Sequence, residues 1–91
     1  MKHAGPEALD TLEPLLAALR QRAALTERSR GVYYRAGRAF LHFHEDGDAF
    51  HADLRMAEAF ERFPATSAAE RRALLRRIDR FLGGGKPAAA R

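Results

Sequence analysis

The sequence predicts one α+β domain: an N-terminal helix, an antiparallel meander of three to four strands and a C-terminal helix, packed as a two-layer sandwich. Apolar residues recur every three or four positions near both ends of the chain, which is the period of an amphipathic helix. Between Val32 and Leu54 they alternate with polar residues, which is the period of a strand. A chain of 91 residues has room for a single core.

The first helix is predicted from Leu12 to Leu25, with Thr11 as its cap and Pro14 in its first turn, where a missing N–H is tolerated. Its apolar stripe consists of Leu12, Leu15, Leu16, Leu19 and Ala23. The polar segment 26–31, which ends in glycine, is predicted to connect this helix to the strands.

Two glycine turns set the predicted strand pairing. Asp46-Gly47 is typical of a type I′ hairpin turn, and it places Phe43 opposite Phe50 and His42 opposite His51. The Ala36-Gly37 turn places Tyr34 opposite Ala39, Tyr33 opposite Phe40 and Val32 opposite Leu41.

Alternation then assigns each strand residue to one of two sheet faces. The predicted core face holds Val32, Tyr34, Ala39, Leu41, Phe43, Phe50, Ala52, Leu54 and Met56. The opposite face holds Tyr33, Arg35, Arg38, Phe40, His42, His44, His51, Asp53 and Arg55. A short further strand is expected around residues 59–63.

The C-terminal helix is predicted from a capping box, in which Ser67 and Glu70 satisfy each other's backbone donors. Its buried stripe is Leu74, Leu75, Ile78 and Leu82, and Gly83 is a helix stop. We therefore expect a partly mobile N-terminal segment over residues 1–11, the folded domain over 12–82 and a mobile tail over 83–91.

The composition of the chain indicates where the protein is located and which partners it could have. No apolar run approaches the roughly 20 residues of a membrane span, there is no cysteine, and the N-terminus lacks the apolar core of a signal peptide, so we expect a cytoplasmic protein. The formal charge of +4 comes from 14 Arg and 2 Lys in an alanine-rich chain without asparagine. That bias is typical of a GC-rich genome, so the charge alone is weak evidence for a nucleic-acid partner.

Three of the four histidines lie in the central hairpin. His42 and His44 point the same way along one strand, the predicted register sets His51 beside them, and Asp53 follows on the same face. Three imidazoles and a carboxylate form a ligand set for zinc or another divalent metal, which could activate a water for hydrolysis. The competing interpretation is a polar sheet face that includes histidine. No nucleophile motif is present, and no catalytic residue is assigned.

The same face also carries aromatic and basic residues. Tyr33 and Phe40 are flanked by Arg35, Arg38 and Arg55. The two aromatic residues could be buried at a homodimer interface or under one of the helices, or they could stack on single-stranded nucleic acid. A ridge of arginines on the last helix (Arg72, Arg76, Arg80) could lie along phosphates, but the solvated face of an amphipathic helix is the preferred interpretation.

The segments 31–46, 52–55, 61–64 and 69–75 resemble a group of small uncharacterised bacterial proteins over roughly residues 12 to 82. That resemblance implies no activity and no site residues. From the residues we expect a non-enzymatic binding or self-associating protein that uses the face bearing Tyr33, Phe40, Arg35, Arg38, His42, His44 and His51. A metal-binding protein and a single-stranded nucleic-acid binder are the alternatives.

Overall fold

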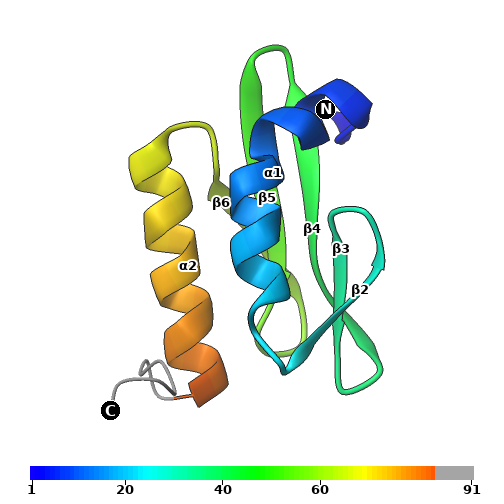
Figure 1. The fold of residues 1–91 in the computed structure, drawn as a ribbon, viewed down its shortest axis with the longest axis vertical. Coiled ribbons are helices and arrows are strands. Elements are labelled where there is room, and N and C mark those ends of the chain that lie inside the picture. The colour runs from blue at the N-terminus through cyan, green and yellow to red at the C-terminus, as the bar shows by residue number, and fades with distance from the viewer. Residues whose placement is uncertain (84–91) are drawn as a thin grey trace.

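The computed structural model describes residues 1–83 of the chain (Figure 1). The elements follow in the order β1 (Lys2–His3), α1 (Pro6–Arg20), β2 (Leu25–Ser29), β3 (Val32–Arg35), β4 (Arg38–Asp46), β5 (Ala49–Arg55), β6 (Phe60–Pro64) and α2 (Ala68–Gly83). The predicted α+β class is confirmed, with an N-terminal helix, an antiparallel meander and a C-terminal helix. No helix in the described part of the chain is long and apolar enough to cross a membrane.

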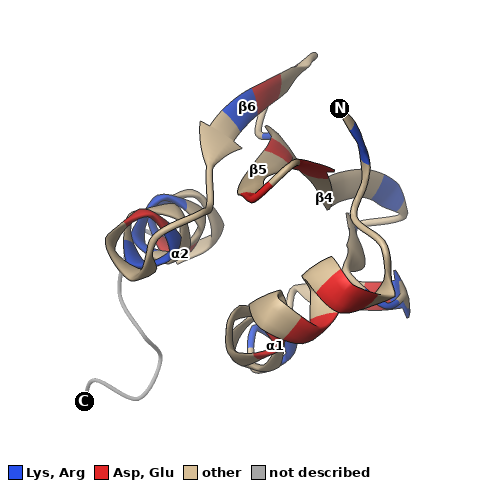
Figure 2. Cartoon of the chain, turned by 90° about the horizontal axis from the view of Figure 1, so that it is seen from above, with Lys and Arg blue, Asp and Glu red and all other residues tan. Residues whose placement is uncertain are grey.

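Strands β2 to β6 pair in chain order, and the short β1 joins the sheet beside the second half of β4. Both helices lie on one side of the sheet (Figure 2). The core between the layers includes Leu12, Leu16 and Leu19 of α1, Leu74 and Ile78 of α2, and Leu41 and Leu54 of the sheet. We call the other side of the sheet, which no described helix covers, the open face.

Helix α1 corrects the predicted helix at both ends. It begins at Pro6, where the fixed φ of proline suits a first helical position, and it ends at Arg20. The N–H of Gly5, just before the helix, donates to the Glu45 carboxylate at 2.7 Å, a long-range hydrogen bond that no local pattern predicts. Pro14 therefore lies inside the helix. Ala8 is buried, so the core includes part of the predicted N-terminal segment 1–11.

The expected polar connection after the first helix is instead a strand. β2 pairs with β3, and of its side chains only Leu25 is buried. The polar sequence of β2 does not predict a strand, because an edge strand with one buried side chain shows little alternation of apolar and polar residues. The strand around residues 59–63 was expected, and β6 confirms it.

The β4–β5 hairpin turns one residue later than predicted. Gly47 and Asp48 occupy the centre, and only Gly47 has a positive φ (61°), which is the pattern of a type II′ turn. Phe43 therefore faces Ala52, and His42 faces Asp53 rather than His51. The slip moves each pairing by two positions, so the sheet faces of residues 41–46 of β4 and of β5 stay as predicted.

A β-bulge between β3 and β4 overturns the predicted placement of the aromatic pair. Tyr34 opposes Ala39 as expected, but Tyr33 then opposes Leu41, and Phe40 is the extra residue. Tyr33 and Phe40 are 1% and 3% exposed in the core, and the Phe40 ring stacks on Phe81 of α2. The expectation that they lie on the histidine-bearing face is therefore wrong.

The start of α2 confirms the predicted capping box. The backbone N–H of Glu70 donates to Ser67 Oγ at 3.0 Å, and the Glu70 carboxylate accepts the N–H groups of Thr66 and Ser67 at 2.9 Å each. Leu74 and Ile78 are buried, whereas Leu75 and Leu82 are half-buried. Of the predicted mobile tail, only Gly83 lies within the described residues, and it ends α2.

Candidate metal centre on the open face

Two rows of side chains cross the open face at right angles to the strands. In the first row, His44 of β4 stands between His3 of β1 and His51 of β5. In the second row, His42 of β4 opposes Asp53, which in turn opposes Arg62 of β6. Because paired residues share a face, these two rows place all four histidines and Asp53 on the open face.

Three of these histidines converge. Each of His3, His42 and His44 offers a ring nitrogen, and the three nitrogens lie within 4.8 Å of one another. The His3 ring stacks on His44 with centroids 4.5 Å apart, and the His42 ring lies 5.1 Å from that of His44. We call these three residues the histidine cluster.

Asp53 adjoins the cluster through one oxygen. Its Oδ2 lies 3.4 Å from His42 Nε2 and 3.2 Å from His44 Nε2. Arg62 holds the same carboxylate in a two-pronged contact, with Nε at 2.7 Å from Oδ1 and Nη2 at 2.9 Å from Oδ2. Since Asp53 is 8% exposed, this pairing fixes a buried charge next to two imidazoles.

The His44 side chain is almost buried and makes no hydrogen bond. Both of its ring nitrogens are shielded from solvent and lack a hydrogen-bond partner, and the contact with Asp53 has the wrong geometry for one. His51 Nδ1 is in the same condition. A buried polar group without a partner costs about 1–3 kcal/mol, so the unpaired ring nitrogens of His44 are candidate ligand atoms.

The surroundings of His42 and His44 favour their neutral forms. Burial lowers the pKa of His42 and of His44, and the neighbouring histidines lower it further, while the charge of Asp53 acts in the opposite direction. The hydrogen bonds from Arg62 lower the pKa of Asp53. At neutral pH His42 and His44 therefore present free imidazole lone pairs beside an ionised carboxylate, which is the state in which these groups bind metals.

Strand β6 closes one side of the centre. The Phe60 ring packs edge-on against His42 with centroids 5.0 Å apart, and Arg55 lies 4.8 Å above the same Phe60 ring. His3 is exposed on the opposite side. The centre is thus walled by β6 and reached from the side of β1.

The structure brings together only part of the predicted site. His42, His44 and Asp53 are in contact, whereas His51 faces His44 across the hairpin and stays outside the cluster. Arg35 and Arg38 pair with each other across the β3–β4 turn, and Arg35 lies over Phe81 of α2. The predicted binding face is therefore not one continuous surface.

Sequence reasoning missed His3. It reaches the cluster because β1 pairs with β4 and sets His3 directly opposite His44. A two-residue strand has no periodicity, so no pattern in the sequence predicts this pairing. The one available signal was that His3 is the remaining histidine of the chain.

Comparison with known proteins adds no relative: no protein-family model, no curated protein and no solved structure matches this chain.

Proposed function

We propose that this protein binds one divalent transition-metal ion, zinc in the first instance, on the open face of its sheet. The ligands are the ring nitrogens of His3, His42 and His44, with Asp53 Oδ2 as the fourth. The observation that carries the proposal is the convergence of three imidazoles around His44, a nearly buried residue whose two ring nitrogens have no hydrogen-bond partner.

The spacing of the donor atoms supports a tetrahedral site. Zinc bonds of about 2.0–2.1 Å set neighbouring ligand atoms about 3.3 Å apart in a tetrahedron. The distances from Asp53 Oδ2 to the Nε2 atoms of His42 and His44, 3.4 and 3.2 Å, already match that edge. The three imidazole nitrogens, within 4.8 Å of one another, need to close by at most about 1.5 Å.

Four protein ligands favour binding over catalysis. Catalytic zinc sites keep one position open for water, whereas structural sites are closed by protein side chains. With Asp53 in the fourth position, this set is closed, which supports the non-enzymatic function predicted from the sequence. Self-association or base stacking through Tyr33 and Phe40 is not part of the proposal, because both side chains are buried. The cytoplasmic location stays a prediction.

Calorimetric titration of zinc into metal-free protein without an affinity tag tests the proposal. We expect one ion per chain, and we expect His44→Gln and His3→Ala each to weaken binding at least about tenfold, because each removes a ligand. His3 is exposed, so His3→Ala leaves the fold intact and separates ligand loss from unfolding.

His51→Gln is the matched control, since His51 is on the same face but outside the cluster. We expect its affinity to stay within about threefold of the parent. Absence of stoichiometric binding, or a loss in His51→Gln as large as that in His3→Ala, would contradict the proposed ligand set.

A further inference from the structure

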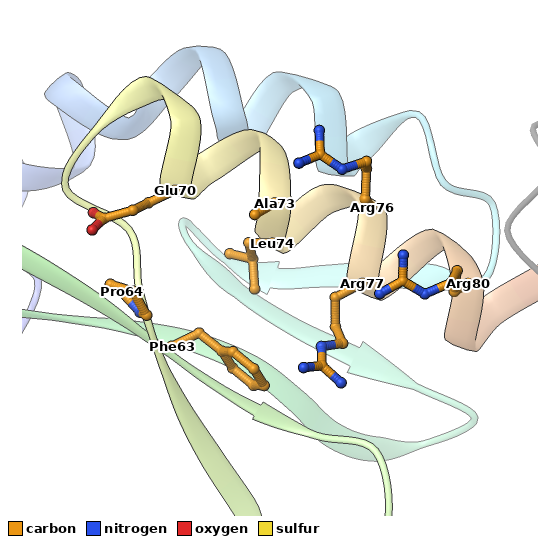
Figure 3. Close-up of a pocket in the computed structure, with 8 residues that line it drawn as sticks. All are labelled: Phe63, Pro64, Glu70, Ala73, Leu74, Arg76, Arg77 and Arg80. Atoms are coloured by element: carbon orange, nitrogen blue, oxygen red, sulfur yellow. The ribbon is translucent and has the colours of Figure 1, made fainter.

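A hollow of about 280 Å³ lies between β6 and α2, and none of the four histidines lines it. Figure 3 shows Phe63 of β6 and Leu74 of α2 facing each other across it, with Arg77 reaching from α2 toward Phe63. The Arg77 guanidinium lies 5.1 Å from the centre of the Phe63 ring. Arg76 and Arg80 line the hollow along the same helix, so it combines an apolar floor with a basic rim.

The charge of this rim is not balanced. Arg76, Arg77 and Arg80 have no ion-pair partner within residues 1–83, although Arg22 and Arg62 are each paired with a carboxylate. The acidic residue of the lining, Glu70, is engaged with the backbone N–H groups at the start of α2. Figure 2 shows the contrast with α1, which carries several acidic residues.

The adjoining strand is an edge of the sheet. β6 pairs with β5 on one side, and no strand among the described residues pairs with its other side. An unpaired strand edge can add an extended chain through backbone hydrogen bonds, and alternate side chains of that chain then point to the same face. Phe63 shares the helix-covered face with Ala52, so those side chains would meet Phe63 and the arginines.

The positive charge beside the edge of β6 favours an acidic partner over a second copy of this chain. A second copy of this chain that paired β6 with β6 would bring two sets of unpaired arginines together, which is repulsive. A partner with carboxylates would neutralise them. We propose that the edge of β6 and the adjoining hollow bind an extended acidic peptide segment, with carboxylates on Arg76, Arg77 and Arg80 and an apolar side chain on Phe63.

Fluorescence anisotropy with labelled eight-residue peptides tests this interaction in metal-free protein, so the outcome is independent of the zinc proposal. The test peptide carries Thr at every second position, so that Glu and Val share the other face and can meet the arginines and Phe63 together. It should bind at low salt, and its counterpart with Lys in place of Glu should not. Two further peptides carry N-methyl groups on the odd-numbered or on the even-numbered backbone nitrogens. One of the two should not bind, because methylation removes the N–H donors that an added strand directs toward β6.

The double variant Arg77→Gln/Arg80→Gln should weaken peptide binding at least about tenfold, since a hydrogen bond to a charged group is worth about one order of magnitude in affinity. Arg72→Gln is the matched control: it changes an exposed arginine of α2 that does not line the hollow, and affinity should stay within about twofold. All three arginines are exposed, so the variants keep the fold, which circular dichroism checks.

Three results would overturn the inference. The first is equal binding of the Glu and Lys peptides, and the second is an effect of Arg72→Gln as large as that of the double variant. The third is tighter binding of a labelled thymidine oligonucleotide that the double variant abolishes, which would assign the rim to nucleic-acid phosphates instead.

Discussion

Ala36 adopts a backbone conformation that alanine disfavours. Its φ is 51°, the one positive φ among the described residues other than glycine, and Gly37 beside it has a φ of 80°. Together they form the turn between β3 and β4, of the type that needs positive φ at both central positions. An L-residue with a side chain is strained there, by roughly 1–2 kcal/mol.

We therefore predict that Ala36→Gly raises the free energy of unfolding by up to about 1 kcal/mol, because relief of strain outweighs the added entropy of the unfolded chain. Urea unfolding at neutral pH measures this change. Gly37→Ala is the opposite test, since it places a second side chain at positive φ, and it should destabilise the protein. A loss of stability in Ala36→Gly would show that the turn is not strained.

The turn sequence of the β4–β5 hairpin is ambiguous, which explains why the predicted register was wrong. Asp46-Gly47-Asp48 fits a turn centred on Asp-Gly or on Gly-Asp, and both place glycine where positive φ is required. Both choices keep the histidines on one face, so the face of His42, His44 and His51 was predictable while their partners were not. In the observed register Phe43 and Ala52 pack opposite each other in the core, a contact between strands that the turn residues alone do not specify.

At the scale of elements, α2 begins with a cap made entirely by its own first turn. Ser67 and Glu70 satisfy backbone donors reciprocally, and both residues are close in sequence. We predict that Ser67→Ala lowers the free energy of unfolding by about 1 kcal/mol, measured by urea unfolding. Ser29→Ala, an exposed serine at the end of β2, serves as control and should change stability by less than about 0.5 kcal/mol.

Some elements of the fold can be predicted from the sequence and others cannot. α2 and the β4–β5 hairpin carry their signals locally, so the sequence predicts them. β1 and the start of α1 depend on distant partners: His3 pairs with His44, and the Gly5 N–H donates to the Glu45 carboxylate. The bulge at Phe40 is likewise non-local, because it forms where Tyr33 and Phe40 both fit under the helices.

For the whole molecule, the histidine cluster couples stability to pH. Burial lowers the folded-state pKa of His42 and His44, so the unfolded chain takes up protons first as the pH falls through the ordinary histidine range. The free energy of unfolding of the metal-free protein should therefore decrease between about pH 7.5 and about pH 5.5.

Urea unfolding across that range measures the slope, and the double variant His42→Gln/His44→Gln should show a shallower dependence, because two of the groups responsible are gone. If the free energy of unfolding of the wild-type protein is the same at both ends of this pH range, the prediction is contradicted, and the imidazoles of His42 and His44 are solvated. Zinc should raise stability at neutral pH and lose this effect in acid, where protons compete for the imidazoles.

The two faces of the sheet have different roles: one packs against the helices, and the other carries the proposed metal ligands. The helices cover Tyr33 and Phe40, and the open face keeps the four histidines with Asp53. Anomalous diffraction at the zinc edge from crystals of the zinc-loaded protein tests this division most directly. We predict one ion bonded to His3, His42, His44 and Asp53. An ion held elsewhere, or crystals without bound zinc at stoichiometric loading, would contradict it.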